Sequence, residues 1–299
     1  MLRTTLLPNQ SPWLRLVLLL SLVTLGAFWG QLLGIRIAYA SAEKLAITDV
    51  TLFTRRPLLI IQAVTASCAF IIAPLFYLRF FASQAEKLLF TWRRSYASPL
   101  LLTLGLALAF IVVNTWFIQW NIAVKLPPWL RTFEAWVQEQ EATQKRLTNL
   151  LTTFHSLTDL GVGILVIGMI PAVGEELLFR GIIQKLCHQI THNIHGAIAV
   201  SALAFSAIHL QFYDFVPRFL LGALFGYIYW WTKDLLFPIA AHFFNNVLTL
   251  LLLFLYQRGI IQQDITTPAV PSKPVLLLFI VLVVVLSHYL KQLSKKSHS

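Results

Sequence analysis

"LGVGILVIGMIPAVGEELLFRG", Leu160 to Gly181, joins an uninterrupted apolar run to three charged side chains. The run has the composition of a membrane-spanning helix, and Glu175, Glu176 and Arg180 follow it directly. Ionisable groups inside a bilayer are costly, and they usually pair with one another or mark a functional site. The stretch therefore predicts a transmembrane helix that carries a polar site.

The composition of the whole chain places it in the membrane. Of its 299 residues, 58% are apolar and only 12% are charged. A water-soluble domain carries about 25% charged residues, so the sequence excludes that class. The net charge of +11 does not indicate a nucleic-acid partner, because the basic residues lie between apolar runs, where membrane proteins keep their anchors. The only cysteines are Cys68 and Cys187, and Cys68 falls inside an apolar run, so a disulfide scaffold is not expected.

Apolar runs long enough to cross a bilayer recur along the chain. A spanning helix needs about 20 residues, because the hydrocarbon core is about 30 Å thick. We therefore expect an all-α membrane protein, a polytopic bundle of about eight transmembrane helices. The fifth and sixth runs are short and carry polar groups, so neighbouring helices are expected to shield them. The predicted spans are 13–34, 57–81, 98–120, 157–176, 196–211, 215–232, 236–256 and 274–290.

The first span has an alternative interpretation as a signal peptide. "AYA" at Ala38–Ala40 has the small-x-small pattern of a cleavage site. The apolar run is too long for a typical signal, and Arg36 interrupts the approach to the site, so we expect an anchor. Eight spans place both termini on one side of the membrane. That side holds 12 Lys and Arg residues, and the other side holds 11. The basic tail "KQLSKKSHS" favours a cytoplasmic location for both termini.

A segment between the third and fourth spans has an amphipathic pattern. Pro127 and Pro128 can open a helix, because its first turn does not need their missing N–H groups. Apolar residues then recur at helical spacing through Phe154, around a polar middle. One interpretation is a helical loop with its apolar face on the bundle. The other is an interfacial helix lying on the lipid headgroups beside a substrate entrance.

Helical spacing separates the three charges of the opening stretch. Four residues turn through about 400°, so Glu176 and Arg180 lie one above the other and can pair. Glu175 and Arg180 are five residues apart, about 140° around the helix. Glu175 therefore has no partner on its own helix. Taken alone, the Glu176–Arg180 pair would more often be structural than functional.

Two later spans also carry polar side chains. "FSAIH" places Phe205 one turn before His209, and "HFFNN" places His242 one turn before Asn246. Taken alone, His209 would be a packing residue bonded to a carbonyl, and Asn246 would join two helices. A free carboxylate, two histidines and an amide on three spans instead favour a site. Such a set suits hydrolysis, because a carboxylate can accept a proton from water while donors stabilise an oxyanion.

A second histidine-rich stretch follows the acidic motif. In "CHQITHNIHG", Cys187, His188, His192 and His195 would fall roughly on one helical face, as metal ligands do. The stretch is more typical of a loop or short interfacial segment, so a metal site is not expected there. His288, near the end of the last span, is expected at the membrane interface.

Three motifs together resemble the CAAX prenyl protease family of intramembrane proteases, which includes bacteriocin-processing and immunity proteins. The family pattern is Glu-Glu-x-x-x-Arg, then Phe-x-x-x-His, then His-x-x-x-Asn. The chain matches it with "EELLFR", "FSAIH" and "HFFNN", all in order. The resemblance covers about 157–256 as a protease core. It leaves 1–156 as amino-terminal spans with the amphipathic segment, and 257–299 as a final helix with a basic tail.

The resemblance implies roles for six residues in an endopeptidase. Glu175 would be the general base, and His209 would share its water or bind a metal. His242 and Asn246 would stabilise the oxyanion or complete a metal site. Glu176 and Arg180 would support the site. The family is described as metallopeptidase, yet a metal-free glutamate mechanism has also been argued for it. A zinc ion could take Glu175, His209 and His242 as ligands, but no second carboxylate would then remain as an obvious base.

The resemblance also implies a location and partners. It indicates a multi-pass protein of the bacterial plasma membrane, or of the endoplasmic reticulum if the chain is eukaryotic. The substrate would be a membrane-embedded or lipidated protein or peptide, and the sequence does not name it or the oligomeric state. Two other functions stay open: a catalytically silent immunity or scaffold protein, and a proton-coupled transporter. Spans six to eight lack further ionisable relay groups and no inverted repeat is visible, which disfavours a transporter.

Overall fold

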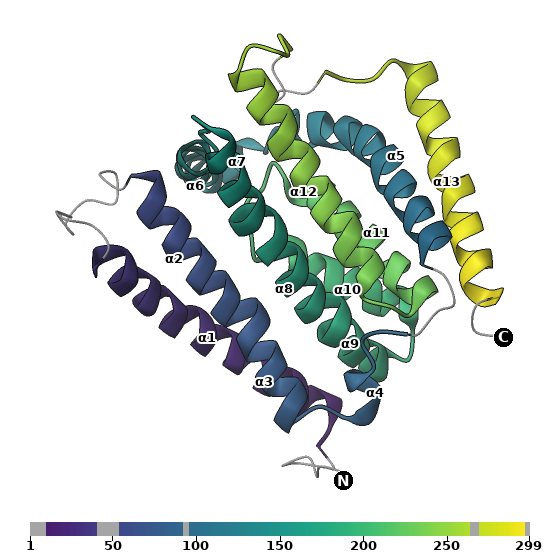
Figure 1. Ribbon diagram of the computed structural model, residues 1–299. Helices are drawn as coiled ribbons and strands as arrows, with labels where there is room; N and C mark the ends of the chain where they lie inside the picture. The colour runs from purple at the N-terminus through teal and green to yellow at the C-terminus, as the bar shows by residue number, and fades with distance from the viewer. Residues whose placement is uncertain (1–9, 41–53, 92–95, 264–268, 297–299) are drawn as a thin grey trace.

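The computed structural model describes residues 10–40, 54–91, 96–263 and 269–296, and this part of the chain folds into helices without a strand (Figure 1). The expected all-α membrane bundle is confirmed. The helices of the amino-terminal half are α1 (Pro12–Ala40), α2 (Arg55–Ser67), α3 (Ala73–Phe80), α4 (Gln84–Lys87), α5 (Ala97–Ile122) and α6 (Arg131–Leu151). Those that follow are α7 (Leu157–Gly163), α8 (Ile170–Leu178), α9 (Gln184–Thr191), α10 (Ile194–Ala207), α11 (Phe215–Thr232), α12 (Leu236–Gln257) and α13 (Lys273–Lys296).

Within the described residues, six helical runs are long and apolar enough to cross a membrane. They correspond to six of the eight predicted spans. The other two predicted spans, 196–211 and 215–232, are α10 and α11. With 14 residues, α10 is about 21 Å long and too short to span a bilayer alone. The bundle therefore has six long helical runs and a shorter helical pair, where the sequence predicted eight spans.

The fourth span extends much further than the sequence predicted. Helical structure is continuous over Leu157–Thr191, so the acidic motif lies inside a 35-residue run and not at its end. Its α-helical parts are joined by two wider i→i+5 turns, η4 (Ile164–Met169) and η5 (Phe179–Ile183). A third such turn, η2 (Cys68–Ile72), joins α2 to α3. Polar contacts to other helices, described below, keep the charged half of the long run helical.

The histidine-rich stretch after the motif is mostly helical, so its prediction as a loop was wrong. Cys187 and His188 lie in α9, and the break is confined to His192, which has a positive φ of 53°, and Asn193. Asn193 then opens α10, because its side chain accepts hydrogen bonds from the N–H groups of His195 and Gly196. This tight cap reverses the chain without the loop that the sequence suggested.

A glycine stripe on α1 brings the first two helices into close contact. A Cβ atom at Gly26 would lie 2.7 Å from the carbonyl oxygen of Cys68, and one at Gly34 would lie 3.0 Å from Cα of Ile61. Gly30 also packs on this neighbouring helical run. Small residues four apart allow helix backbones to approach closely in membranes. The sequence analysis did not use this repeat.

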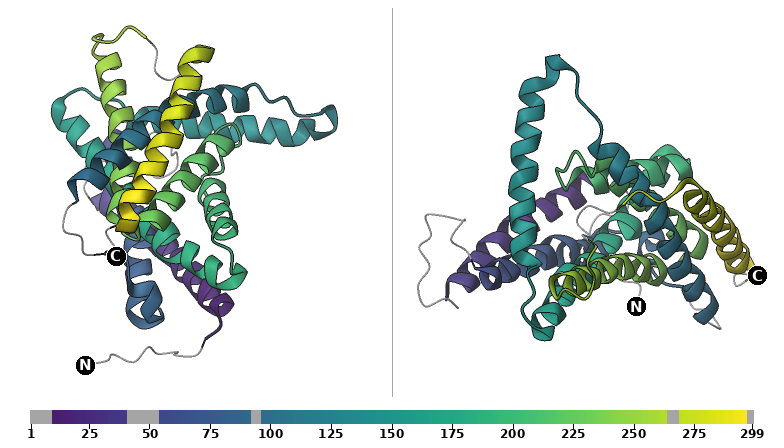
Figure 2. Two further views of the ribbon diagram at one scale, coloured as in Figure 1. Left: turned by 90° about the vertical axis from the view of Figure 1, so that its right-hand side faces the viewer. Right: turned by 90° about the horizontal axis from the view of Figure 1, so that it is seen from above.

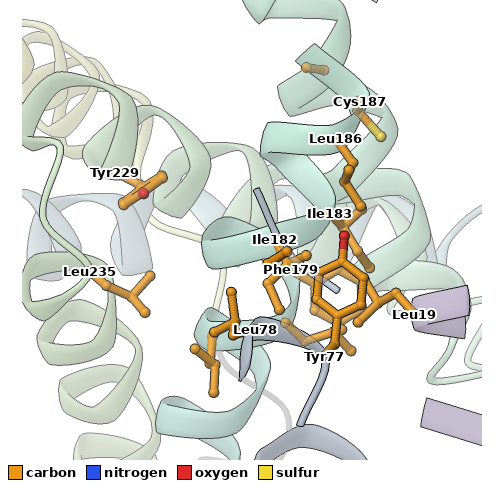
Figure 3. Close-up of a cluster of buried hydrophobic side chains, with 14 of the residues drawn as sticks. Leu19, Tyr77, Leu78, Phe179, Ile182, Ile183, Leu186, Cys187, Tyr229 and Leu235 are labelled. Atoms are coloured by element: carbon orange, nitrogen blue, oxygen red, sulfur yellow. The ribbon is translucent and has the colours of Figure 1, made fainter. Parts of the chain in front are cut away.

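Buried side chains join α1 to the helices that carry the acidic motif. Figure 3 shows Leu19 and Tyr77 converging on Phe179, Ile182 and Ile183. Nearby, Arg15 forms a buried ion pair with Glu86, which also accepts a hydrogen bond from the hydroxyl of Tyr77. These contacts make α1 part of the packed bundle, and its role as an uncleaved anchor stays a prediction.

Both ends of the bundle are recognisable from their polar contacts. At one end Arg55 of α2 bonds to Asp159 of α7 at 3.0 Å, and Gln257 of α12 bonds to Thr152. At the opposite end Arg15 contacts Gln189, near the start of α1 and the end of α9. There α13 also ends, since its Leu290 shares a core cluster with Phe237 at the start of α12 (Figure 1). The described chain thus starts and finishes at one end, as predicted; which side of the membrane this is stays a prediction.

The amphipathic segment forms α6, which crosses one end of the bundle. Both views in Figure 2 show α6 running across the long helices and projecting beyond them. Only Val137 is buried on this helix, whereas Phe133 and Trp136 are 41% and 48% exposed. Because most of the apolar face is uncovered, the geometry favours the interfacial interpretation over a helix packed on the bundle. A role at a substrate entrance stays a prediction.

Candidate active site

The predicted site residues come from four neighbouring elements. Glu175 and Glu176 lie on α8, Arg180 lies in η5, His242 and Asn246 lie on α12, and His209 immediately follows α10. The two glutamates, Arg180 and His242 are each at most 8% exposed. His209 and Asn246 are partly exposed. The site therefore combines a closed charged interior with a more open polar side.

Glu176 and Arg180 form the predicted ion pair. The Nη1 atom of Arg180 lies 2.8 Å from Oε1 of Glu176, and both side chains are almost fully buried. The Nη2 atom of Arg180 donates to the carbonyl oxygen of Gly222 at 2.7 Å. Gly222 also lies close to α10, since a Cβ atom there would lie 3.1 Å from the ring of Phe205. The pair thus ties the acidic helix to α11.

His242 contacts both glutamates through different nitrogens. Its Nδ1 lies 2.8 Å from Oε1 of Glu176, and its Nε2 lies 3.9 Å from Oε2 of Glu175. The carboxylate of Glu176 can only accept, so Nδ1–H of His242 is the donor. In the neutral ring, Nε2 then carries a lone pair directed towards Glu175. Glu176 thereby fixes the orientation and tautomer of His242, which spacing along the sequence did not predict.

Two phenylalanines frame these charged groups. The guanidinium carbon of Arg180 lies 4.8 Å from the ring centre of Phe205 and 5.4 Å from that of Phe225. His242 stacks on Phe225 with ring centres 5.1 Å apart, and Phe205 meets His242 edge-on at 6.0 Å. A cation held against aromatic faces is stabilised by the ring quadrupole. Phe205 was part of the recognised pattern. Phe225 was missed, because it belongs to none of the three motifs.

His209 and Asn246 bond to helix backbones in this structure. Nδ1 of His209 lies 2.8 Å from the carbonyl oxygen of Phe205, so this nitrogen carries the proton and Nε2 is the unprotonated one in the neutral ring. Phe205 also lies between the two histidines, with the His209 ring 5.3 Å away. Asn246 donates to the carbonyl oxygen of Gly168 at 3.4 Å, a long bond. These are the packing contacts that the sequence analysis kept as alternatives for both residues.

Arg218 is a charged residue of the site region that the sequence analysis overlooked. It lies in the first turns of α11, within the predicted sixth span, and its Nη2 bonds to Asp214 at 3.1 Å. It interacts electrostatically with Glu175 and with His209. The prediction that spans six to eight lack further relay groups did not cover Arg218, because an arginine stays protonated and cannot relay protons. The available signal was a lone arginine in "FVPRFLLGALFG".

The loop between α10 and α11 is held by two other helices. Asn121 of α5 bonds to the carbonyl oxygen of Phe212 and to the N–H group of Val216. Glu141 of α6 accepts from the N–H group of Tyr213 at 2.9 Å. The loop separates His209 from Arg218, so α5 and α6 help to position both. Neither Asn121 nor Glu141 belongs to a motif that the sequence analysis recognised.

The predicted zinc ligands do not form a metal-binding cluster. Among the residues that the structure describes, no three His, Cys, Asp or Glu side chains lie together in a way that could hold a metal ion. His242 uses Nδ1 for Glu176, and His209 uses Nδ1 for a carbonyl. These bonds leave Nε2 of both histidines free, and a histidine that binds a metal usually donates its other N–H in this way. The zinc ligand set therefore stays a prediction, and no step below passes through a metal.

The histidine-rich stretch directs its side chains to other partners. Nδ1 of His195 lies 2.7 Å from the hydroxyl of Tyr227, and the His188 ring packs edge-on against Trp230. Both histidines thus serve the packing of α9 and α10 on α11. His288 is exposed on α13, and its place at the membrane interface stays a prediction.

Comparison with known proteins tests the family resemblance. A family model described as "type II CAAX prenyl endopeptidase Rce1-like" matches residues 158–248. The family resemblance is confirmed for this segment. The CAAX-protease-like core thus contains all three motifs, from the acidic pair to Asn246, and the geometry above is the geometry of that core. The predicted division of the chain around it stays a prediction.

A curated relative and the solved structures add less. The uncharacterized protein YpbD of Bacillus subtilis (strain 168) is 30% identical over 84 residues, which are 27% of this chain and 40% of YpbD. The chain thus matches well under half the length of that relative. No solved structure matches. The apolar helical runs support a multi-pass membrane protein, and residues 158–248 are similar to a family of endopeptidases. The activity, mechanism and substrate of this chain are matters for proposal.

Proposed function

We propose that this protein hydrolyses a peptide bond of a membrane-associated or lipidated substrate, with Glu175 as general base on the attacking water. One observation carries the proposal: the adjacent carboxylates Glu175 and Glu176 have different surroundings. Glu176 accepts hydrogen bonds from Arg180 and His242, whereas no described residue donates a hydrogen bond to Glu175, and Nε2 of His242 lies 3.9 Å from it. A buried carboxylate without a strong donor remains available to accept a proton.

The first step uses Glu175 and His209. Glu175 accepts a proton from a water molecule as the water oxygen attacks the carbonyl carbon of the peptide bond. Nε2 of His209, unprotonated because Nδ1 donates to Phe205, can accept the second water hydrogen and orient the attack. A positioned base of this kind typically accelerates a reaction by about 10²–10⁴-fold.

His242 then stabilises the protonated form of Glu175. Its Nε2 lone pair faces Oε2 of Glu175 at 3.9 Å, and a protonated carboxyl group can donate to it once the two side chains close that gap. Glu176 and Arg180 keep His242 in this tautomer. Glu175 finally passes the proton to the leaving amine nitrogen, which restores the carboxylate and breaks the C–N bond.

Asn246 supplies a donor for the developing oxyanion. Its present bond to the carbonyl oxygen of Gly168 is 3.4 Å long and can be exchanged for a shorter bond to an anionic oxygen. Oxyanion donors of this kind are worth about 10²–10³-fold in rate. This role and those above deepen the family-level assignment and are proposals.

A cleavage assay tests the proposal. The full-length protein, purified in lipid nanodiscs, is incubated with a library of lipid-anchored peptides, and mass spectrometry identifies new termini. Cleavage by wild type and its loss in Glu175→Gln would support the mechanism. The backbone contacts of His209 and Asn246 also suit a catalytically silent protein, and a wild-type protein that cleaves no member of the library would favour that function.

A further inference from the structure

Arg218 differs from Arg180 in how its guanidinium group is satisfied. Both Nη atoms of Arg180 are bonded, one to Glu176 and one to the carbonyl oxygen of Gly222. Arg218 bonds through Nη2 to Asp214, while its Nη1 is closed to solvent and has no hydrogen-bond partner. A buried donor without an acceptor is costly, more so on a charged group. Arg218 therefore holds an unused charged donor.

The partner of Arg218 does not neutralise it strongly. Asp214 is 45% exposed on its side chain, whereas the Arg218 side chain is 19% exposed. Ion pairs with a well-solvated partner contribute little, because water screens them and competes for the charges. Glu175 and Glu141 also interact electrostatically with Arg218, but its Nη1 atom has no acceptor and remains the donor for another anion.

The position of Arg218 relates this donor to the reacting groups. Arg218 interacts electrostatically with Glu175, the proposed base. It also interacts with His209, which the proposed reaction uses to orient water. It lies on α11 immediately after the loop between α10 and α11, on the more open side of the site.

We infer that Arg218 binds a carboxylate of the substrate near the bond that is cleaved, an inference that rests on the proposed function. Guanidinium groups match carboxylates in shape and charge, and a pair formed away from water is strong. The carboxylate comes from the free carboxyl end of a peptide or from an acidic side chain near the cleaved bond. Substrates that lack such a group bind more weakly.

Binding is measured with matched probes on full-length protein carrying Glu175→Gln, so that no probe is consumed. The first probe is an N-palmitoylated hexapeptide with a free carboxyl end, and the second is its carboxamide. The third is the carboxamide with an aspartate next to its last residue. We expect the free acid or the aspartate probe to bind at least about tenfold tighter than the plain amide. Which of the two does so identifies the source of the carboxylate. Equal affinity for all three probes, or binding of none, overturns the inference.

Variants then assign the preference to Arg218. Adding Arg218→Gln is expected to reduce the acid-to-amide affinity ratio to about one, and Arg218→Lys to keep part of it. Arg146→Gln, on the exposed surface of α6, is the matched control and should keep the full ratio. Melting curves accompany each variant, and if Arg218→Gln does not fold, Arg218→Lys decides. A ratio unchanged in a folded Arg218 variant contradicts the assignment.

The experiment also separates this inference from the proposed function. A wild-type protein that prefers the acidic probe but cleaves nothing would support the carboxylate site and contradict the proposed peptidase activity. A protein that cleaves acid and amide probes with equal kcat/KM would support the peptidase activity and contradict the carboxylate site. Neither result depends on the other, because binding is measured without turnover.

Discussion

The Nε2 atom of His242 lies 3.9 Å from a carboxylate oxygen of Glu175, too far for a hydrogen bond. The other ring nitrogen, Nδ1, is bonded to Glu176, so the imidazole ring cannot rotate freely and Nε2 stays directed towards Glu175. The two acids of the motif therefore have separate tasks: Glu176 holds the network together, and Glu175 faces the histidine without a bond.

Replacing Glu175 by glutamine tests the base directly. Glu175→Gln keeps the shape of the side chain but removes the proton acceptor, so kcat should fall by about 10²–10⁴-fold while the melting temperature changes little. Glu139→Gln, on the exposed surface of α6, is the control for charge and should keep full activity. A fully active Glu175→Gln protein would sink the catalytic assignment.

Replacing Glu176 should act first on stability. Glu176→Gln leaves Arg180 buried without its countercharge, which typically costs about 3–5 kcal/mol. Activity should also fall, because the glutamine amide at this position fixes the orientation of the His242 ring less firmly than the carboxylate of Glu176 does. Adding Arg180→Gln restores neutrality and should recover part of the lost stability in a detergent melting curve. An inactive Glu176→Gln protein of unchanged stability would show that the roles of the two acids are confused.

Gly222 should tolerate no side chain. Gly222→Ala would place a Cβ atom 3.1 Å from the ring of Phe205 and 3.2 Å from Cβ of Ala202, so the neighbouring side chains on α10 have to shift by a few tenths of an ångström. Overpacking of this kind costs about 1–3 kcal/mol and should also weaken the Arg180 bond to the backbone. Gly161→Ala is the matched control, since its Cβ would meet no atom within 4 Å. It should be neutral or slightly stabilising in the same melting assay, and equal destabilisation of both variants would contradict the packing argument.

The buried pair at the other end should support folding rather than catalysis. Glu86 is fully buried and binds Arg15 and Tyr77, so Glu86→Gln leaves the guanidinium without its countercharge. We expect a loss of about 3 kcal/mol and faster proteolysis of the amino-terminal helices, with kcat preserved in the folded fraction. Lys87→Gln, a neighbouring change without this buried pair, serves as the control. A specific loss of kcat without loss of stability would place Glu86 in the catalytic machinery.

Chelation tests the arrangement of the histidines. Because the described residues do not gather three metal ligands, activity should survive a strong chelator. Elemental analysis of the active, chelated protein should then find no stoichiometric zinc. Loss of activity that zinc restores would instead show that His209 and His242 rearrange to bind a metal.

Patterns of local composition predicted much of the molecule. Apolar runs located the six described helical runs that are long enough to cross a membrane, because crossing lipid requires an apolar segment of about 20 residues. The Glu176–Arg180 pair also followed from spacing, since both residues lie on one helical run. The bond between His242 and Glu176 did not, because it joins residues 66 positions apart and depends on how α12 packs on α8.

Other features were missed because they depend on tertiary contacts. Arg218 is an ordinary basic residue in the sequence, and only its buried Nη1 atom sets it apart. The extent of the fourth helical run was missed because polar residues after Arg180 resemble a loop. In the structure Gln184 donates to the carbonyl oxygen of Gly226, so a polar residue there stabilises helix packing.

The wider turns η2, η4 and η5 have a consequence for how related sequences align. In each, an N–H group bonds five residues back, so the turn holds about one residue more than a regular one. Elsewhere in a helix, deleting one residue rotates everything beyond it by about 100°. Here the deletion can be absorbed by converting the wide turn into a regular one. Relatives with single-residue gaps should therefore carry them at these turns, with the faces of the flanking helices still in register.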